Sequence, residues 1–252
     1  MTKLCGIGAV AVALAAGSAM GNVHAWTWER GDTNSNNGGG VIERIETSFQ
    51  TSARELTFSV WFSNQVTDGF TLALNDGPNP KGHAGELALI YLDASDTNDV
   101  RVNSFAYNGQ NTQKSFEDGS AASGIQTPDA IATSTGALAR NGFAVGSVTD
   151  TEDGWRRIDL TLDVRGINSH SPLHPGPGGA EEWYGIGFDE LLGIWFHPVK
   201  DLTTAYDQDG FLSEWNGREG YVDTANRVTI PGPGAAMLAG VGGLMIGARR
   251  RR

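Results

Sequence analysis

Side chains alternate between an apolar and a mainly polar face along residues 55–64, and again along residues 158–164. The apolar positions of the first stretch are Leu56, Phe58, Val60 and Phe62. A period of two is typical of a β-strand that buries one face and leaves the other in water. Outside its two ends, the chain has no long segment with the 3.6-residue period of a helix. The body is therefore predicted to consist of antiparallel sheets.

Turn signals separate the apolar stretches. Glycine makes up 35 of the 252 residues, about twice the usual share of roughly 7%. Many short strands between Asp-Gly and Asn-Gly turns favour an all-β fold, an antiparallel β-sandwich or jelly roll. The predicted strands are Val41–Phe49, Glu55–Asn64, Phe70–Asn75, Glu86–Asp93, Val100–Asn108, Gly142–Val148, Trp155–Val164, Glu190–His197, Leu202–Tyr206 and Tyr221–Ile230.

Two of these segments carry further expectations. Glu86–Asp93 is almost continuously apolar, which suits a central strand that is covered on both faces. Asn111–Thr135 is polar and weakly patterned, so it is expected to be a long connection. No repeat and no internal boundary divides the body. We therefore predict a single sandwich domain over residues 26–229.

Residues 1–25 have the pattern of a secretory signal peptide. A basic residue, Lys3, precedes a short apolar region at residues 4–16. Two small-x-small sequences follow, Ala19-Met20-Gly21 and Val23-His24-Ala25, so cleavage is expected before Asn22 or before Trp26. The one cysteine, Cys5, lies inside this segment, and the mature chain is expected to contain no thiol.

The charge of the body excludes one class of partner. The chain has 18 basic and 29 acidic residues, and five of the basic ones, but no acidic one, lie in the two end segments. The body therefore carries 13 basic residues against 29 acidic residues, a net charge near −16. Binding to nucleic acid needs a basic face, so a nucleic-acid partner is not expected.

The last 23 residues, 230–252, have a distinct composition. An uncharged run rich in glycine and alanine, Gly234–Ala248, is followed by Arg249, Arg250, Arg251 and Arg252. As a helix the run would be about 22 Å long, shorter than the bilayer core of about 30 Å. Flanking arginines keep such a segment's end in the cytoplasm. This predicts a short hydrophobic helix that inserts transiently in the inner membrane, with an ordinary tail anchor or a buried helix as alternatives.

Together with Pro231, Gly232 and Pro233, this tail resembles the C-terminal sorting signal of PEP-CTERM proteins. The shared features are a Pro-x-Pro motif, a short Gly/Ala/Leu-rich span and a terminal arginine cluster, in that order. Gly232 departs from the family, which most often has Glu there. The resemblance implies export to the cell surface or extracellular matrix of a Gram-negative-type bacterium, with an exosortase-type enzyme as processing partner.

Parts of the body resemble PEP-CTERM surface proteins with a lectin-like sandwich. The similar stretches are Leu74–Lys81, Glu86–Ala88, Tyr107–Asn111 and Ile194–Pro198. This resemblance implies no known reaction. Exopolysaccharide is the corresponding candidate partner.

No catalytic residues are assigned. The acidic pair Asp159 and Asp163 is four residues apart on a polar face, too far for a retaining glycosidase, in which the carboxyl groups lie about 5–5.5 Å apart. A nucleophile elbow and a zinc-type histidine spacing do not occur in the sequence. The chain is thus expected not to be an enzyme, and a glycoside hydrolase remains a second alternative.

Two kinds of binding site remain as candidates. Carboxylates close together in turns can hold a structural calcium, although plain surface turns are the simpler interpretation. The calcium candidates are Asp93, Asp96, Asp99, Asp207 and Asp209. Flat aromatic rings outside the core can stack on sugars, and Asn side chains can bind hydroxyls. The glycan-contact candidates are Trp61, Trp155, Asn75 and Asn79. The leading interpretation is a non-catalytic surface or matrix protein, and the alternative is a carbohydrate-binding module.

Overall fold

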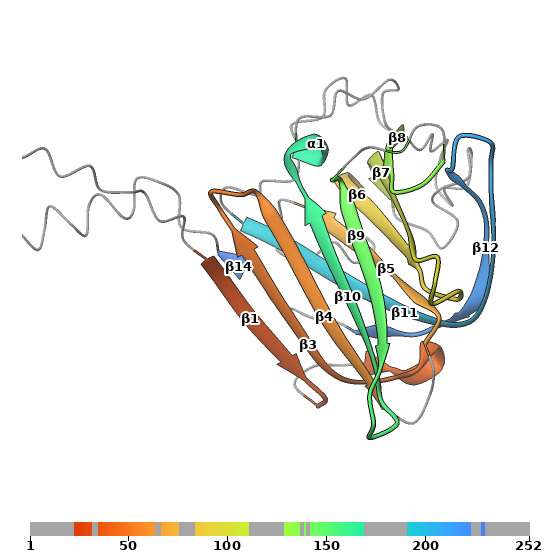
Figure 1. Cartoon of the computed structure of the whole chain (residues 1–252). Coiled ribbons are helices and arrows are strands. Elements are labelled where there is room, and N and C mark those ends of the chain that lie inside the picture. The colour runs from red at the N-terminus through yellow and green to blue at the C-terminus, as the bar shows by residue number, and fades with distance from the viewer. Residues whose placement is uncertain are drawn as a thin grey trace, which may run out of the picture.

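The computed structural model describes most of the body of the chain. The described residues are 23–31, 35–63, 67–75, 84–110, 129–136, 139, 142–168, 191–222 and 228–229. They fold into antiparallel sheets with very little helix, which confirms the predicted all-β class. Figure 1 shows the arrangement of the strands.

The first sheet has five strands in the order β1-β3-β4-β10-β9, each antiparallel to its neighbours. They span Val23–Glu29 (β1), Val41–Gln50 (β3), Glu55–Ser63 (β4), Arg156–Asp163 (β10) and Ala144–Asp150 (β9). The two alternating stretches of the sequence, now β4 and β10, are direct neighbours.

The second sheet has the order β2-β13-β11-β5-β6-β7-β8, and β12 and β14 pair with β11. Its long strands are Gly69–Asn75 (β5), Ala84–Asp93 (β6), Arg101–Gln110 (β7), Leu191–Tyr206 (β11) and Leu212–Glu219 (β12). Its short strands are Ser35–Asn36 (β2), Asp129–Thr133 (β8), Tyr221–Val222 (β13) and Val228–Thr229 (β14). The remaining elements are a 3-10 turn, Asn37–Gly39 (η1), and one helical turn, Arg165–Asn168 (α1).

Strands of both sheets contribute to one large hydrophobic cluster, the main core. Its fully buried large side chains come from both sheets and include Phe49, Phe58, Phe62, Leu56, Phe70, Leu72, Leu74, Ile90 and Phe196. The rings of Phe70 and Phe196, on neighbouring strands, are 4.8 Å apart. Burying each such side chain contributes about 1.5–3 kcal/mol. The apolar residues of the period-two pattern in β4, such as Phe58 and Phe62, are thus the residues that form the core.

Strand β6 is buried on both faces, as its continuous apolar sequence predicted. Ile90 points into the core between the sheets, whereas Leu89 and Tyr91 belong to a second cluster on the opposite face. The second half of β11 and strand β12 supply the cover for that face. Trp215 of β12 packs edge-on against Tyr91, with ring centres 5.3 Å apart. The sheet therefore curls over its own outer surface.

Strand β11 corrects one sequence expectation. Two separate strands, Glu190–His197 and Leu202–Tyr206, were predicted, but the structure has one strand from Leu191 to Tyr206. The pairing with β12 shifts between Lys200 and Thr203, and Asp201 has a positive φ of 56°. Aspartate tolerates this left-handed conformation better than most residues. The strand therefore bends at a bulge instead of ending.

Other boundaries also differ from expectation. Strands β8 and β12 were not predicted, and β8 lies in the segment expected to be a long connection. Strand β10 begins at Arg156, so Trp155 belongs to the preceding turn. Strand β1 begins at Val23, three residues before the expected start of the domain at residue 26.

Candidate functional site

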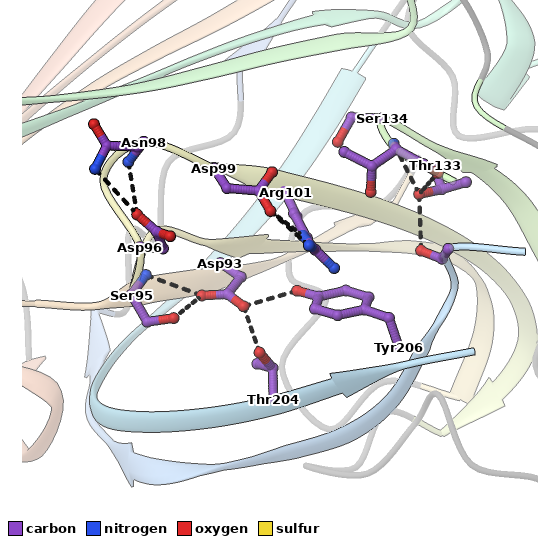
Figure 2. A network of polar contacts seen from close by, with 12 residues as sticks. Asp93, Ser95, Asp96, Asn98, Asp99, Arg101, Thr133, Ser134, Thr204 and Tyr206 are labelled. Atoms are coloured by element: carbon purple, nitrogen blue, oxygen red, sulfur yellow. Dashed lines mark hydrogen bonds and ion pairs between the residues drawn. The ribbon is translucent and has the colours of Figure 1, made fainter. Parts of the chain in front are cut away.

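A polar cluster surrounds Asp93, the last residue of β6 (Figure 2). Asp93 is only 5% exposed. Its Oδ1 accepts hydrogen bonds from the amide of Ser95 at 2.9 Å and from the hydroxyl of the same residue at 2.6 Å. Its Oδ2 accepts from the hydroxyls of Thr204 at 2.6 Å and Tyr206 at 2.8 Å. An ionised carboxylate offers about four acceptor positions. The four hydrogen bonds to Asp93 therefore occupy its whole accepting capacity.

Tyr206 is held in its neutral, donating form. Burial raises the pKa of its hydroxyl, and the negative charge of Asp93 raises it further. The guanidinium of Arg101 lies over the Tyr206 ring, 4.6 Å from its centre, and also pairs with Asp99 at 2.5 Å. The cluster thus ties the turn after β6 to the end of β11 (Figure 2).

The first candidate calcium turn is organised by hydrogen bonds within the protein. Oδ1 of Asp96 accepts from the backbone amide of Asn98 at 2.9 Å, while Asp99 pairs with Arg101. Asp93 belongs to the buried cluster described above. Calcium needs six to eight oxygen ligands, and a cation here would have to displace these donors. The carboxylates of this turn are thus engaged by donors within the protein, and a calcium ion here stays a prediction.

The second candidate turn has a similar construction. Oδ1 of Asp207 accepts from the amides of Asp209 and Phe211, both at 2.9 Å, which closes a tight turn. The turn is anchored by Thr133, whose hydroxyl donates to the carbonyl of Gly210 at 2.9 Å. Across the described residues, no group of three or more His, Cys, Asp or Glu side chains is placed to hold a metal ion.

Trp61 lies on the outer, polar face of the first sheet, as its phase in β4 predicted. Arg44 on β3 and Arg157 on β10 are its direct cross-strand partners. Their guanidinium groups lie over the indole ring, 4.1 Å and 5.0 Å from its centre. Cation–π contacts of this kind stabilise by about 0.5–1 kcal/mol at exposed sites. A sugar stacking on Trp61 would have to compete with these arginines.

The acidic pair considered for hydrolysis is also engaged. Oδ1 of Asp159 accepts from the hydroxyl of Ser59 at 2.5 Å and from Nε of Arg157 at 2.8 Å. Asp163 forms an ion pair with Arg165, the first residue of α1. Each carboxylate therefore has a cationic partner of its own, and the arrangement braces the outer face of the sheet.

The other glycan-contact candidates are placed differently. Trp155 is 40% exposed at the turn between β9 and β10. Its amide and carbonyl bond to Thr151, which closes the turn. The backbone of Asn75 ends β5, opposite Gly193, but its side chain lies outside the described residues, as does Asn79. Of these candidates, Trp155 is the one with an exposed ring.

A small apolar pocket lies between the two sheets near β1. It is lined by residues from β1, β3, β4 and β11, namely Trp26, Trp28, Ile45, Thr47, Phe58, Ile194 and Phe196. Both tryptophans come from β1, the edge strand of the first sheet. Sequence reasoning missed this pocket because it placed no strand at residues 23–29.

Sequence reasoning also missed the partners that complete the polar clusters. Thr204 and Tyr206 are 111 and 113 residues from Asp93. For the cluster around Trp61, the sequence held one local signal. Arg44, Arg157 and Trp61 each alternate with the apolar residues of their own strands. That signal places all three residues on polar faces but does not place them side by side.

The sorting-signal residues Pro231, Gly232, Pro233 and Arg249–Arg252 lie outside the described residues. Within the described part of the chain, no helix is long and apolar enough to cross a membrane. The sequence matches no known family model, and it has no match among curated proteins.

Proposed function

We propose that this chain is an exported, non-catalytic protein of the cell surface or extracellular matrix of a Gram-negative-type bacterium. The observation that carries the proposal is the tail, in which Pro231-Gly232-Pro233, an uncharged run and four arginines follow in order. An exosortase-type enzyme is the proposed processing partner. The strongly acidic body agrees with this role, because a high net charge favours solubility outside the cell.

The proposal is tested by mass spectrometry and cell fractionation of the protein expressed in its full length. The expected mature species lacks Arg249–Arg252 and is found in the envelope or medium. Replacing the four arginines by glutamine is expected to disturb the insertion and the processing of the tail, because the positive charges that keep its end in the cytoplasm are lost. Replacing them by lysine retains the charge and is the matched control. An intact arginine cluster on the exported protein would contradict processing of the tail.

We infer further that the body is a β-sandwich of the jelly-roll, lectin-like kind. The support is the main core, to which both sheets contribute, with Phe58 from the first sheet and Phe196 from the second. An experimental structure in which these two side chains belong to separate cores would contradict this inference.

A carbohydrate-binding module is the second candidate function, and exposed Trp155 is the observation that favours it. Indole rings stack on the apolar faces of sugars, and Trp155 presents its ring at a hairpin turn. Affinity electrophoresis on purified exopolysaccharide should then show retardation that Trp155→Ala removes. Val145, an exposed apolar residue on β9, supplies the control Val145→Ala. Equal migration of the protein with and without polymer counts against binding.

Hydrolysis is the third and least supported candidate. Asp159 and Asp163 are each paired with an arginine, which leaves neither carboxylate placed as a free acid or base. Polysaccharides are therefore expected to remain intact in the presence of the protein. Hydrolysis that Asp159→Asn abolishes would show that the protein is an enzyme.

A further inference from the structure

The two candidate cleavage sites of the signal peptide differ in what they leave of strand β1. Cleavage before Asn22 keeps the whole strand, Val23–Glu29. Cleavage before Trp26 removes its first three residues and leaves four. The strand itself therefore distinguishes two sites that the sequence alone leaves equal.

The first three residues are an integral part of the first sheet. Their backbone pairs with β3 without a register shift, Val23 opposite Gln50, His24 opposite Phe49 and Ala25 opposite Ser48. The side chains alternate as well, with Val23 and Ala25 exposed and His24 partly buried on the face that carries Trp26 and Trp28. All seven residues of β1 pair with β3, and cleavage before Trp26 would leave only four of these pairs.

Removing these residues would uncover part of the core. Phe49 is fully buried and lies directly across from His24. Loss of His24 would expose one side of this ring, and buried apolar area is worth about 25 cal/mol per Å². The end of β3 from Ser48 to Gln50 would also lose its backbone partners on that side.

The new charge gives a second reason. Hydrolysis leaves an α-ammonium group that is largely protonated near neutral pH. Cleavage before Trp26 places this charge inside the sheet, opposite buried Thr47 and on the residue that lines the apolar pocket. A charge next to apolar side chains loses part of its hydration, which costs free energy. Cleavage before Asn22 places it one residue ahead of Val23, whose side chain is 60% exposed.

We infer that signal peptidase cleaves between Gly21 and Asn22 and that Val23–Ala25 stay in the mature protein as the start of β1. Water adds across this peptide bond, which gives a carboxylate on Gly21 of the leader and an α-ammonium on Asn22. The inference rests on the proposed export, because without export no signal peptidase acts on the chain.

The test is N-terminal sequencing of the protein recovered from the envelope or medium after expression of the full chain. A sequence that begins Asn-Val-His-Ala is expected. A sequence that begins Trp-Thr-Trp, alone or as the major species, overturns the inference and leaves the export proposal intact. An uncut chain that begins with Met1 and stays in the cytosol overturns the export proposal and the inference with it.

Two matched substitutions sharpen the result. Signal peptidase needs a small residue immediately before the cleaved bond. Ala25→Val blocks the second site and suits an exposed strand position, so the mature terminus is expected to stay at Asn22. Gly21→Val blocks the first site, and loss of the Asn22 terminus is expected. If Ala25→Val, but not Gly21→Val, prevents maturation, the inference is wrong.

A further measurement addresses the physical reason. Two chains produced without the leader, one starting at Asn22 and the other at Trp26, are compared in urea. The longer chain is expected to unfold at a higher urea midpoint. Equal midpoints would remove the structural argument for the first site.

Discussion

The hydroxyl of Tyr206 donates a 2.8 Å hydrogen bond to the buried carboxylate of Asp93, 113 residues earlier in the chain. This contact joins the end of β11 to the end of β6 and fixes the point where the second sheet curls over itself. Because both groups are largely removed from water, their hydrogen bonds cannot readily be replaced by solvent. Two of our predictions follow from this pair.

Asp93→Ala is expected to destabilise the fold by about 1–3 kcal/mol or more, because four hydrogen-bond donors lose their acceptor. Urea unfolding measures the effect. Asp96→Ala, in the same turn but exposed, is the control and should cost less than about 1 kcal/mol. Equal effects of the two substitutions would mean that the buried cluster does not hold the turn.

Tyr206 should make the stability depend on alkaline pH. Its pKa in the folded protein lies above the unfolded value near 10, so the folded state favours the neutral phenol. The resulting stabilisation is complete below about pH 10 and is lost as the pH rises further. The unfolding free energy of the natural protein should then fall more steeply above pH 10 than that of Tyr206→Phe. Parallel curves for the two proteins would contradict the burial of this hydroxyl.

Arg44 and Trp61 should be energetically coupled. A double-mutant cycle with Arg44→Ala and Trp61→Ala is expected to give about 0.5–1 kcal/mol, the range for an exposed cation–π contact. Arg218 on β12, which pairs with Asp201 instead, supplies the control cycle with Trp61, and its coupling should be within about 0.3–0.5 kcal/mol of zero. Similar coupling in the two cycles would exclude a specific contact.

Two glycines with positive φ should respond differently to alanine. Gly136 has φ 87°, and an added Cβ would lie 2.5 Å from the carbonyl oxygen of Asp209. Gly154 has φ 77° with open space around the Cβ position. Gly154→Ala should cost about 1–2 kcal/mol from backbone strain, and Gly136→Ala should cost clearly more. Thermal unfolding compares the two, and equal costs would show that the turns at Gly136 and Gly210 are not closely packed.

Strands and their buried faces were predictable where the signal is local. The alternation in β4 placed Leu56 and Phe58 inward and Trp61 outward, and the apolar run in β6 indicated burial on both faces. These predictions succeeded because a side chain's face depends on its own position within its strand. The same reasoning failed for β12. Its buried residues Leu212 and Trp215 are three positions apart, so the strand shows no apolar period of two.

The polar sites were less predictable. The acidic residues near Asp93 and Asp207 were identified as neighbours in sequence, with plain surface turns as the simpler interpretation and calcium ligands as the alternative. Their actual partners, Tyr206 for Asp93 and backbone amides for Asp207, depend on how the chain returns and turns. The sequence does not show whether the oxygens of a carboxylate are free to bind a ligand or already accept hydrogen bonds from the protein.

The order of residues was sufficient for the β class, the buried faces of the main strands, the acidic body and the two distinctive end segments. Each of these follows from composition or from the side-chain period of a single segment. The pairing of β4 with β10, the stacking of Arg44 and Arg157 on Trp61, the bulge at Asp201 and the inclusion of Val23–Ala25 in β1 required the folded chain. They depend on contacts between segments far apart in sequence, whose geometry is set by the packing of the shared core.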